Sequence, residues 1–106
     1  WRAKGADTFA PVGPWIETDI DPSELDLVVR INSDQVQICN TRDMLFTFPE
    51  IVSCISQQVT LRPGDLVFSG ATGVTVAIRP GDKVEVDIPG IGVLENSVEL
   101  EFDSKH

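Results

Sequence analysis

The chain has 106 residues, of which 17 are Asp or Glu and 8 are Lys or Arg, so its formal net charge is −9. This length predicts one domain, residues 1–106, with a core of modest size. A hydrophobic content of 42% is typical of a globular protein, and no apolar run approaches the roughly 20 residues of a membrane span. We therefore expect no membrane partner, and the acidic charge disfavours nucleic acid because phosphate backbones would be repelled.

Cysteine and histidine usage narrows the possible chemistry. Cys39 and Cys54 are too few for a disulfide scaffold, and no Cys or His spacing resembles a zinc site. Reduced thiols are typical of a cytoplasmic protein, which is the location we expect. The single histidine, His106, is the last residue, so a Ser-His or Cys-His nucleophile is close to excluded.

The first predicted strands follow a stretch rich in proline and glycine, which favours an extended path with turns. Strict alternation over residues 25–31 predicts a half-buried strand. Asn-Ser-Asp at residues 32–34 supplies turn chemistry, and Val36 and Ile38 continue the apolar pattern on a return strand. These residues together predict a β-hairpin.

One helix is predicted over about residues 48–58. Thr47 can cap it, Pro49 fits its first turn, and Glu50 lies three residues after Thr47, as a capping box requires. Apolar residues then recur at helical spacing, and the helix is expected to end near Gln58, before a β-branched pair.

Two similar segments predict turns and strands in the second half. Residues 61–65 and 78–82 each contain Arg-Pro-Gly-Asp, the signature of a type II turn, and an apolar strand is expected after each. Strands at 84–88 and 94–102 are expected to pair antiparallel, with their acidic side chains facing water. The chain is therefore predicted to be mainly β.

The aspartates that close these turns, Asp65 and Asp82, are expected to accept hydrogen bonds from nearby backbone rather than to bind a metal ion.

Residue types alone leave the functional residues open. Lys4 lies in a Gly- and Pro-rich stretch, where a lone lysine is usually a solvated surface residue. Residues 40–44 form a polar run that is most simply a connecting loop. Residues 69–73, Ser-Gly-Ala-Thr-Gly, could present backbone N–H groups and a hydroxyl to an anion, or form a plain turn.

Five motifs stand in a fixed order along residues 3–99. They are Ala3-Lys4-Gly5-Ala6-Asp7, Asn40-Thr41-Arg42-Asp43-Met44, the helix, Arg62-Pro63-Gly64-Asp65 with the apolar run to Gly70, and Ile88-Pro89-Gly90-Ile91-Gly92 with Glu95-Asn96. Each motif alone is weak, but in this order and spacing they resemble the fumarylacetoacetate hydrolase family. That family includes acylpyruvate hydrolases and 2-hydroxyhepta-2,4-diene-1,7-dioate isomerases.

The resemblance implies a fold and a chemistry. It is to the C-terminal portion of the family's catalytic domain, a mixed, mainly β sandwich or roll that is usually dimeric. Family members bind Mg²⁺, Mn²⁺ or Ca²⁺ through carboxylates and hold a β-diketo or 2-oxo acid against the ion. The ion polarises substrate oxygens during C–C hydrolysis, decarboxylation or keto–enol isomerisation.

The resemblance also assigns residues. Lys4 matches the family lysine beside the substrate oxygens, so it is the expected catalytic and substrate-binding cation. Gly70 and Thr72 are expected in the substrate-binding loop, although Ala71 stands where the family usually has threonine. The family's metal carboxylates precede the lysine motif, so the metal ligands are expected outside this chain and no residue here is assigned to the metal.

Three functions are therefore weighed. The first is part of a metal-dependent hydrolase or isomerase of 2-oxo or β-diketo acids, with these 106 residues inactive alone. The alternative is a truncated, non-catalytic β module that binds a small anion or a protein partner, and the third is a plain assembly subunit. Either a homo-oligomer, such as a dimer, or association with the missing N-terminal part is expected.

Overall fold

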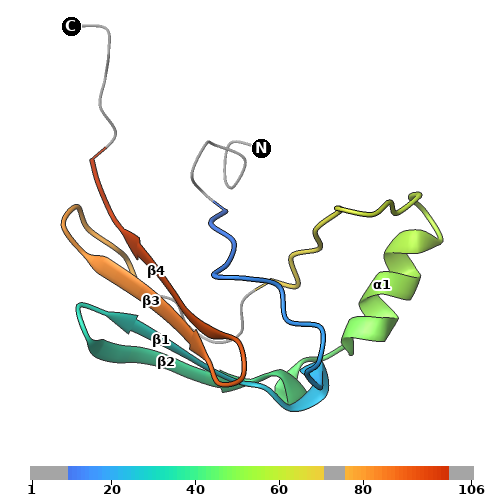
Figure 1. Ribbon diagram of the computed structural model, residues 1–106, viewed down its shortest axis with the longest axis horizontal. Coiled ribbons are helices and arrows are strands. Elements are labelled where there is room, and N and C mark those ends of the chain that lie inside the picture. Colours follow the sequence, from blue (N-terminus) through green and yellow to red (C-terminus); the bar gives the residue numbers. More distant parts are fainter. Residues whose placement is uncertain (1–9, 71–75, 101–106) are drawn as a thin grey trace, which may run out of the picture.

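A computed structural model describes residues 10–70 and 76–100 of the chain. Figure 1 shows one twisted sheet with a single α-helix, α1, to its side. The elements in chain order are the 3₁₀ turn η1 (Pro22–Glu24), strands β1 (Asp26–Ile31) and β2 (Asp34–Asn40), the 3₁₀ turn η2 (Thr41–Asp43), α1 (Phe48–Ser56), and strands β3 (Lys83–Ile88) and β4 (Gly92–Ser97). The predicted mainly β fold with one helix is confirmed.

The sheet has four antiparallel strands in the order β2-β1-β3-β4. The outer pairs, β1 with β2 and β3 with β4, are hairpins of neighbouring strands. The central pair, β1 with β3, joins distant parts of the chain, with Val29 opposite Val86 and Arg30 opposite Glu85. Within the described residues this sheet forms a single layer (Figure 1).

The first hairpin is confirmed, including its turn. Asn32 and Ser33 have φ values of 53° and 71°, the left-handed conformation that a tight two-residue hairpin turn requires. The pairing slips by one residue after Val29, so that Val36 is the extra residue of a β-bulge. The bulge places Val36 with Val29 and Ile31 on the same side of the sheet.

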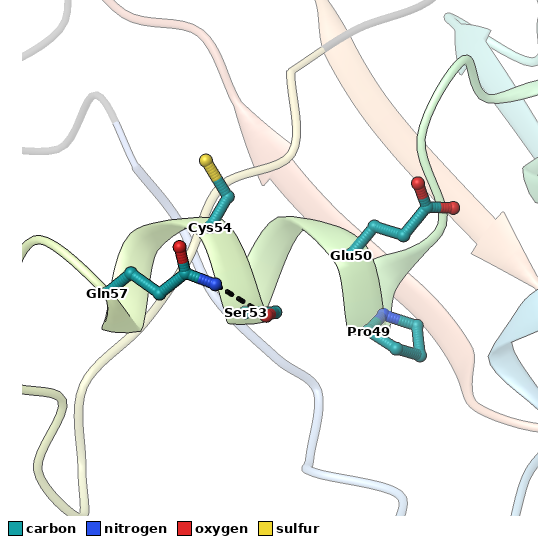
Figure 2. Close-up of a pocket in the computed structure, with 5 residues that line it drawn as sticks. All are labelled: Pro49, Glu50, Ser53, Cys54 and Gln57. Carbon is teal, nitrogen blue, oxygen red and sulfur yellow. Dashed lines mark hydrogen bonds between the residues drawn. The ribbon is translucent and has the colours of Figure 1, made fainter.

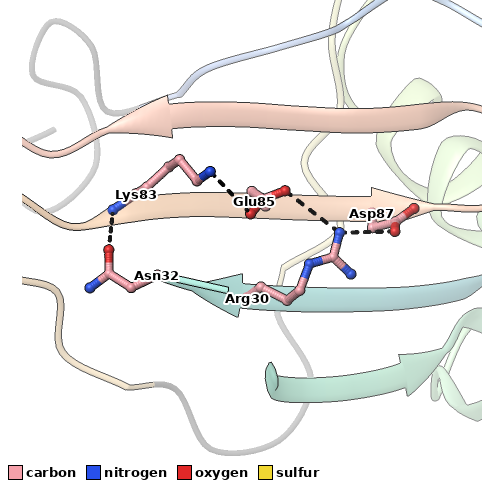
Figure 3. A network of polar contacts seen from close by, with 5 residues as sticks. All are labelled: Arg30, Asn32, Lys83, Glu85 and Asp87. Atoms are coloured by element: carbon pink, nitrogen blue, oxygen red, sulfur yellow. Dashed lines mark hydrogen bonds and ion pairs between the residues drawn. The ribbon is translucent and has the colours of Figure 1, made fainter. Parts of the chain in front are cut away.

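The two faces of the sheet differ in chemistry because side chains alternate along each strand. One face carries Leu27, Val29, Ile31, Val84, Val86 and Ile88. The other carries Arg30 between two carboxylates, at 3.0 Å from Asp87 and 3.7 Å from Glu85 (Figure 3). The expectation that these acidic side chains face water is wrong for Glu85, whose side chain is only 15% exposed because it lies against Arg30.

Helix α1 begins as predicted. The Thr47 hydroxyl accepts a hydrogen bond from the Glu50 backbone N–H at 3.2 Å, and the Thr47 N–H donates to the Glu50 carboxylate at 3.3 Å. The helix ends at Ser56, two residues before the expected Gln58, and the N–H groups of Gln58 and Val59 both donate to the carbonyl of Ile55 just beyond its end.

Both Pro-Gly-Asp turns form as predicted. Gly64 and Gly81 have φ values of 94° and 92°. Each turn is closed by its aspartate: the Arg62 N–H donates to Asp65, and the Arg79 N–H donates to Asp82, both at 2.8 Å. The hydrogen bond from the Arg79 N–H lowers the pKa of the Asp82 carboxyl, and the hydrogen bond from the Asn32 side chain lowers it to a smaller extent.

Two expected strand segments are missing. Residues 66–68 form no strand in the structure, and Leu66 and Phe68 are 59% and 67% exposed. No described strand lies beside this segment to accept its backbone hydrogen bonds. Strand β4 also ends at Ser97 rather than 102, after which Val98 bonds to the backbone of Gly81 and Asp82; residues 101–106 lie outside the described residues.

The expected core is not closed. Among the described residues no hydrophobic side chain is fully buried, and Asn40, at 9% exposure, is the one buried polar residue. A single sheet can bury an apolar face only against a second layer. The apolar face is formed, but the described residues cover it only in part: Gly13 and Trp15 lie close to Leu94 and Gly92 of β4.

Asn32 connects the β1–β2 turn to the start of β3 (Figure 3). Its side chain donates to Asp82 at 2.8 Å and accepts from the Lys83 N–H at 2.9 Å, while its own N–H donates to the Lys83 carbonyl at 2.9 Å. These bonds join two segments that lie fifty residues apart in the chain.

We predict that Asn32→Gly weakens the β1–β3 pairing by about 1–2 kcal/mol, because the side-chain hydrogen bonds are lost. Asn32→Ala loses the same bonds and also disfavours the positive φ, by roughly a further 1 kcal/mol. Amide hydrogen exchange in β1 and β3 should therefore accelerate in the order wild type, Gly, Ala. Equal exchange in all three proteins would contradict this account.

Candidate functional site

The structure places one of the three predicted substrate-binding residues. Gly70 lies at the edge of a groove on the apolar face of the sheet. Lys4 and Thr72 lie outside the described residues, so their assignments stay predictions. The groove beside Gly70 is therefore the part of the predicted site that the structure describes.

The groove has a volume of about 550 Å³ and runs over β1 and β3. Its floor is aliphatic, and its rim is formed by the end of β2, the turn η2, the start of α1 and the segment ending at Gly70. The described lining residues are Pro22, Leu25, Leu27, Val29, Gln37, Cys39, Asn40, Thr41, Met44, Phe48, Ser69, Gly70, Val86, Ile88 and Ile91.

Gly70 brings backbone rather than side chain to this rim. Its φ is 84°, which L-residues rarely adopt, and no other atom lies within 4 Å of the position a Cβ would take. Ser69 beside it supplies a hydroxyl at the same edge. Because the strand expected before this loop does not form, the role of its backbone N–H groups towards an anion stays a prediction.

Hydrogen bonds of the polar run at residues 40–44 hold the rim of the groove in place. Asn40 caps η2 by accepting from the Arg42 N–H at 2.9 Å, and its amide donates to Asp26 at 2.9 Å. The Thr41 hydroxyl donates to the Pro22 carbonyl at 2.6 Å and accepts from the Leu25 N–H at 2.8 Å. These side chains therefore join η2 to the segment that precedes β1.

Sequence reasoning missed this role and described the run as a connecting loop. The available signal was Asn40 directly before a short polar segment, since asparagine is a preferred N-cap. The hydrogen bond from the Leu25 N–H to the Thr41 hydroxyl joins residues 16 positions apart. It has no signal in the sequence because it depends on the sheet register.

No described residue that lines the groove is charged. Arg30 is on the opposite face of the sheet, and its hydrogen bond to Asp87 raises its pKa further. An anion bound in the groove would therefore need a cation from outside the described residues. Lys4 is the cation that the sequence predicts.

The described residues do not fit a divalent metal centre. They contain no group of three or more His, Cys, Asp or Glu side chains placed to hold an ion. Asp65 and Asp82 are occupied by their turns, and Glu85 and Asp87 by Arg30. A Mg²⁺ or Ca²⁺ ion needs about six oxygen ligands that converge on one point.

A second hollow lies on the outer side of α1 (Figure 2), between Pro49, Glu50, Ser53, Cys54 and Gln57. Gln57 donates to the Ser53 hydroxyl at 3.4 Å, and Glu50 is engaged in the capping box. The Cys54 thiol is exposed, and neither it nor Cys39 forms a disulfide. No acid, base and nucleophile converge here, so this surface offers no catalytic arrangement among the residues described.

The fold and the groove define a class: a mainly β segment whose sheet presents an open, uncharged apolar face beside a glycine-containing loop. The chain belongs to the fumarylacetoacetate hydrolase family, because the family model described as "Fumarylacetoacetate (FAA) hydrolase C-terminal" matches residues 1–99. The resemblance inferred from the motifs is confirmed.

Solved structures share this fold closely. A 5-carboxymethyl-2-hydroxymuconate delta-isomerase from Mycobacterium smegmatis is 39% identical with a TM-score of 0.92, over 96% of this chain and 41% of that chain. A 2-hydroxyhepta-2,4-diene-1,7-dioate isomerase from Mycobacterium marinum is 46% identical with a TM-score of 0.90, over 92% and 39%.

A hydrolase structure contains a metal ion. Maleylpyruvate hydrolase from Sphingobium sp. SYK-6, in complex with manganese(II) and pyruvate, is 35% identical with a TM-score of 0.83, over 88% of this chain and 36% of that chain. Among curated relatives, a 2,4-didehydro-3-deoxy-L-rhamnonate hydrolase from Sphingomonas is 35% identical over 92% of this chain and 38% of its own length.

The chain spans about two fifths of the length of the curated relatives that it matches, between 38% and 44% for the first three. Among the described residues no helix is long and apolar enough to cross a membrane.

We predict that the 106-residue chain alone binds Mn²⁺ or Mg²⁺ no more tightly than millimolar, because its described residues contain no group of three or more His, Cys, Asp or Glu side chains placed to hold an ion. Isothermal titration calorimetry of the purified chain measures this directly. Micromolar affinity would contradict the account, and substitution of Asp7 or Asp103 would then identify ligands outside the described residues.

Proposed function

We propose that this chain forms part of a divalent-metal-dependent hydrolase or isomerase of small 2-oxo or β-diketo acids, such as an acylpyruvate or a ring-cleavage dioate. Family membership and relatives named as hydrolases and isomerases support this class. A cytoplasmic location and a homodimeric state are further parts of the proposal that rest on the thiols and on the family resemblance.

One observation carries the proposal furthest. The Sphingobium maleylpyruvate hydrolase holds manganese(II) and pyruvate, and it shares its fold with 88% of this chain. Pyruvate is a 2-oxo acid, the smallest member of the proposed substrate class. Since the described residues do not fit a metal site, we propose that the ion's ligands come from polypeptide outside this chain.

This chain's own residues have a different task in the proposal. The aliphatic floor of the groove, which includes Leu27 and Val86, excludes water from the substrate's carbon chain. Ser69 and Gly70 border the oxygens of the substrate, and Thr72 donates a hydroxyl hydrogen bond beside them. Lys4 contacts the substrate and neutralises the negative charge that develops on an enolate oxygen.

We predict that Lys4→Met lowers kcat/KM by about 100-fold or more, because one charge contact made in the transition state is lost. The measurement uses a chimera in which this chain replaces the matched segment of the Mycobacterium marinum isomerase, assayed with Mn²⁺ for loss of an acylpyruvate. The Met side chain keeps the length of Lys without its charge.

Lys83→Met is the matched control. Lys83 lies on the opposite face of the sheet, with its ammonium 3.9 Å from Glu85, so its loss should leave kcat/KM within about twofold. Full activity of the Lys4→Met chimera would overturn the assignment of Lys4. A folded chimera that binds Mn²⁺ and turns over no 2-oxo acid would overturn the proposed function.

A pair of glycine substitutions tests the groove. Gly70 and Gly64 have φ values of 84° and 94° and open space at the Cβ position, so Ala imposes a similar backbone strain at each. Only Gly70 borders the groove. We predict that Gly70→Ala lowers kcat/KM of the chimera at least tenfold relative to Gly64→Ala. Equal effects would place the substrate elsewhere.

A further inference from the structure

The groove beside Gly70 is larger than the 2-oxo acid group that the proposed function places there. Its volume is about 550 Å³, within the range of pockets that hold a whole small molecule. Pyruvate, which the Sphingobium maleylpyruvate hydrolase holds, would fill only a small part of this space. The rest of the groove is available to the part of a substrate that extends from its 2-oxo acid group, which we call the substrate tail.

One end of the groove, where strand β3 ends, is built from apolar side chains of two segments. Ile88 is the last residue of β3, and Ile91 follows it in the turn before β4. Pro22 and Leu25 line the same groove from the segment that precedes β1, and hydrogen bonds of 2.6 and 2.8 Å tie both residues to the Thr41 hydroxyl. We call these four apolar residues the tail wall.

Close packing behind the tail wall fixes the turn that carries Ile91. A Cβ atom at Gly90 would lie 2.9 Å from Ile20 Cδ1, and a Cβ atom at Gly92 would lie 3.2 Å from the Trp15 indole. These contacts join the segment before β1 to the β3–β4 turn, so the two segments that form the wall support each other. Ile91 itself is half-buried and borders the groove.

The tail wall offers nothing that could pair with a second carboxylate. None of the described residues that line the groove is charged. Arg30 lies on the opposite face of the sheet, 3.0 Å from Asp87 (Figure 3). Lys4, the cation that the sequence predicts, is already assigned to the 2-oxo acid group. A carboxylate against the wall would therefore lose hydration without gaining a partner, and the net charge of −9 repels a dianion more than a monoanion.

We infer that this groove selects 2-oxo acids with an uncharged aliphatic tail over dioates of the same length, and that Ile91 is the specificity-determining residue. The tail packs on Ile88 and Ile91, where apolar surface of both partners leaves water. This inference rests on the proposed function and narrows its substrate class, because alkyl acylpyruvates satisfy the tail wall and ring-cleavage dioates do not.

The test is a titration of the 106-residue chain with 2-oxohexanoate and with 2-oxoadipate at pH 7, without metal. The two acids have carbon chains of equal length, and only 2-oxoadipate ends in a second carboxylate. Methyl NMR shifts of Leu27, Ile88 and Ile91 report binding in the groove. We expect 2-oxohexanoate to bind at least about tenfold more tightly, because the second carboxylate of 2-oxoadipate finds no partner at the tail wall.

A charge added to the wall should change this preference. Ile91→Arg supplies a partner for the second carboxylate, so the preference for 2-oxohexanoate should fall at least about fivefold. Ile38→Arg is the matched control, since Ile38 lies on the opposite face and is 67% exposed. It adds the same charge, so the preference should stay within about twofold of wild type. Ile91→Gln adds polarity without charge and should weaken 2-oxohexanoate without tightening 2-oxoadipate.

Four results would overturn the inference. They are equal affinity of the wild-type chain for the two acids, no binding of either acid, binding of 2-oxohexanoate that leaves the three methyl signals unshifted, and an equal change of preference in Ile38→Arg and Ile91→Arg. The first three need only the wild-type chain, so they do not depend on the folding of a variant. Because no reaction is measured, a chimera without turnover would count against the proposed function and leave this binding preference standing.

Discussion

The pairing of β1 with β3 is the interaction on which the rest of the structure depends. It joins two hairpins that are far apart in the sequence, and it is reinforced at one end by Asn32 with Asp82 and along its length by Arg30 with Asp87. Because the register sets Val29 opposite Val86, it also sorts the sheet into one aliphatic face and one mixed face, where Arg30, Glu85 and Asp87 lie beside Val28, Ile38 and Val93. A slip of one residue would mix the two faces and remove the groove.

Local patterns predicted the elements whose signals are local. The alternation before Asn32, the capping box of Thr47 and Glu50, and the glycine turn at residue 81 each specify a conformation through neighbours in the sequence. The strand expected after Asp65 did not form, since a strand also needs a partner, and partners depend on topology rather than on propensity. The sequence predicts a solvent-exposed Glu85 because its partner, Arg30, lies on a strand that is distant in the sequence although adjacent in the sheet.

The candidate site shows the same division. Gly70 could be found from its motif, but the groove beside it is assembled from residues of six elements, η1, β1, β2, η2, α1 and β3, and has no signature in the sequence. The structural roles of Asn40 and Thr41 likewise arise from bonds across the sheet. The assignments of Lys4 and Thr72 rest on family resemblance and stay predictions. In the proposed function, this chain therefore shapes the substrate pocket, and polypeptide outside this chain holds the ion.

A crystal structure of the chimera with the Mycobacterium marinum isomerase, soaked with Mn²⁺ and pyruvate, tests this proposal most directly. The account predicts that every protein ligand of the ion comes from outside the segment that this chain supplies, and that the Lys4 ammonium lies within hydrogen-bonding distance of pyruvate at the Gly70 end of the groove. An ion held by carboxylates of this chain, or pyruvate bound away from Gly70, would contradict it.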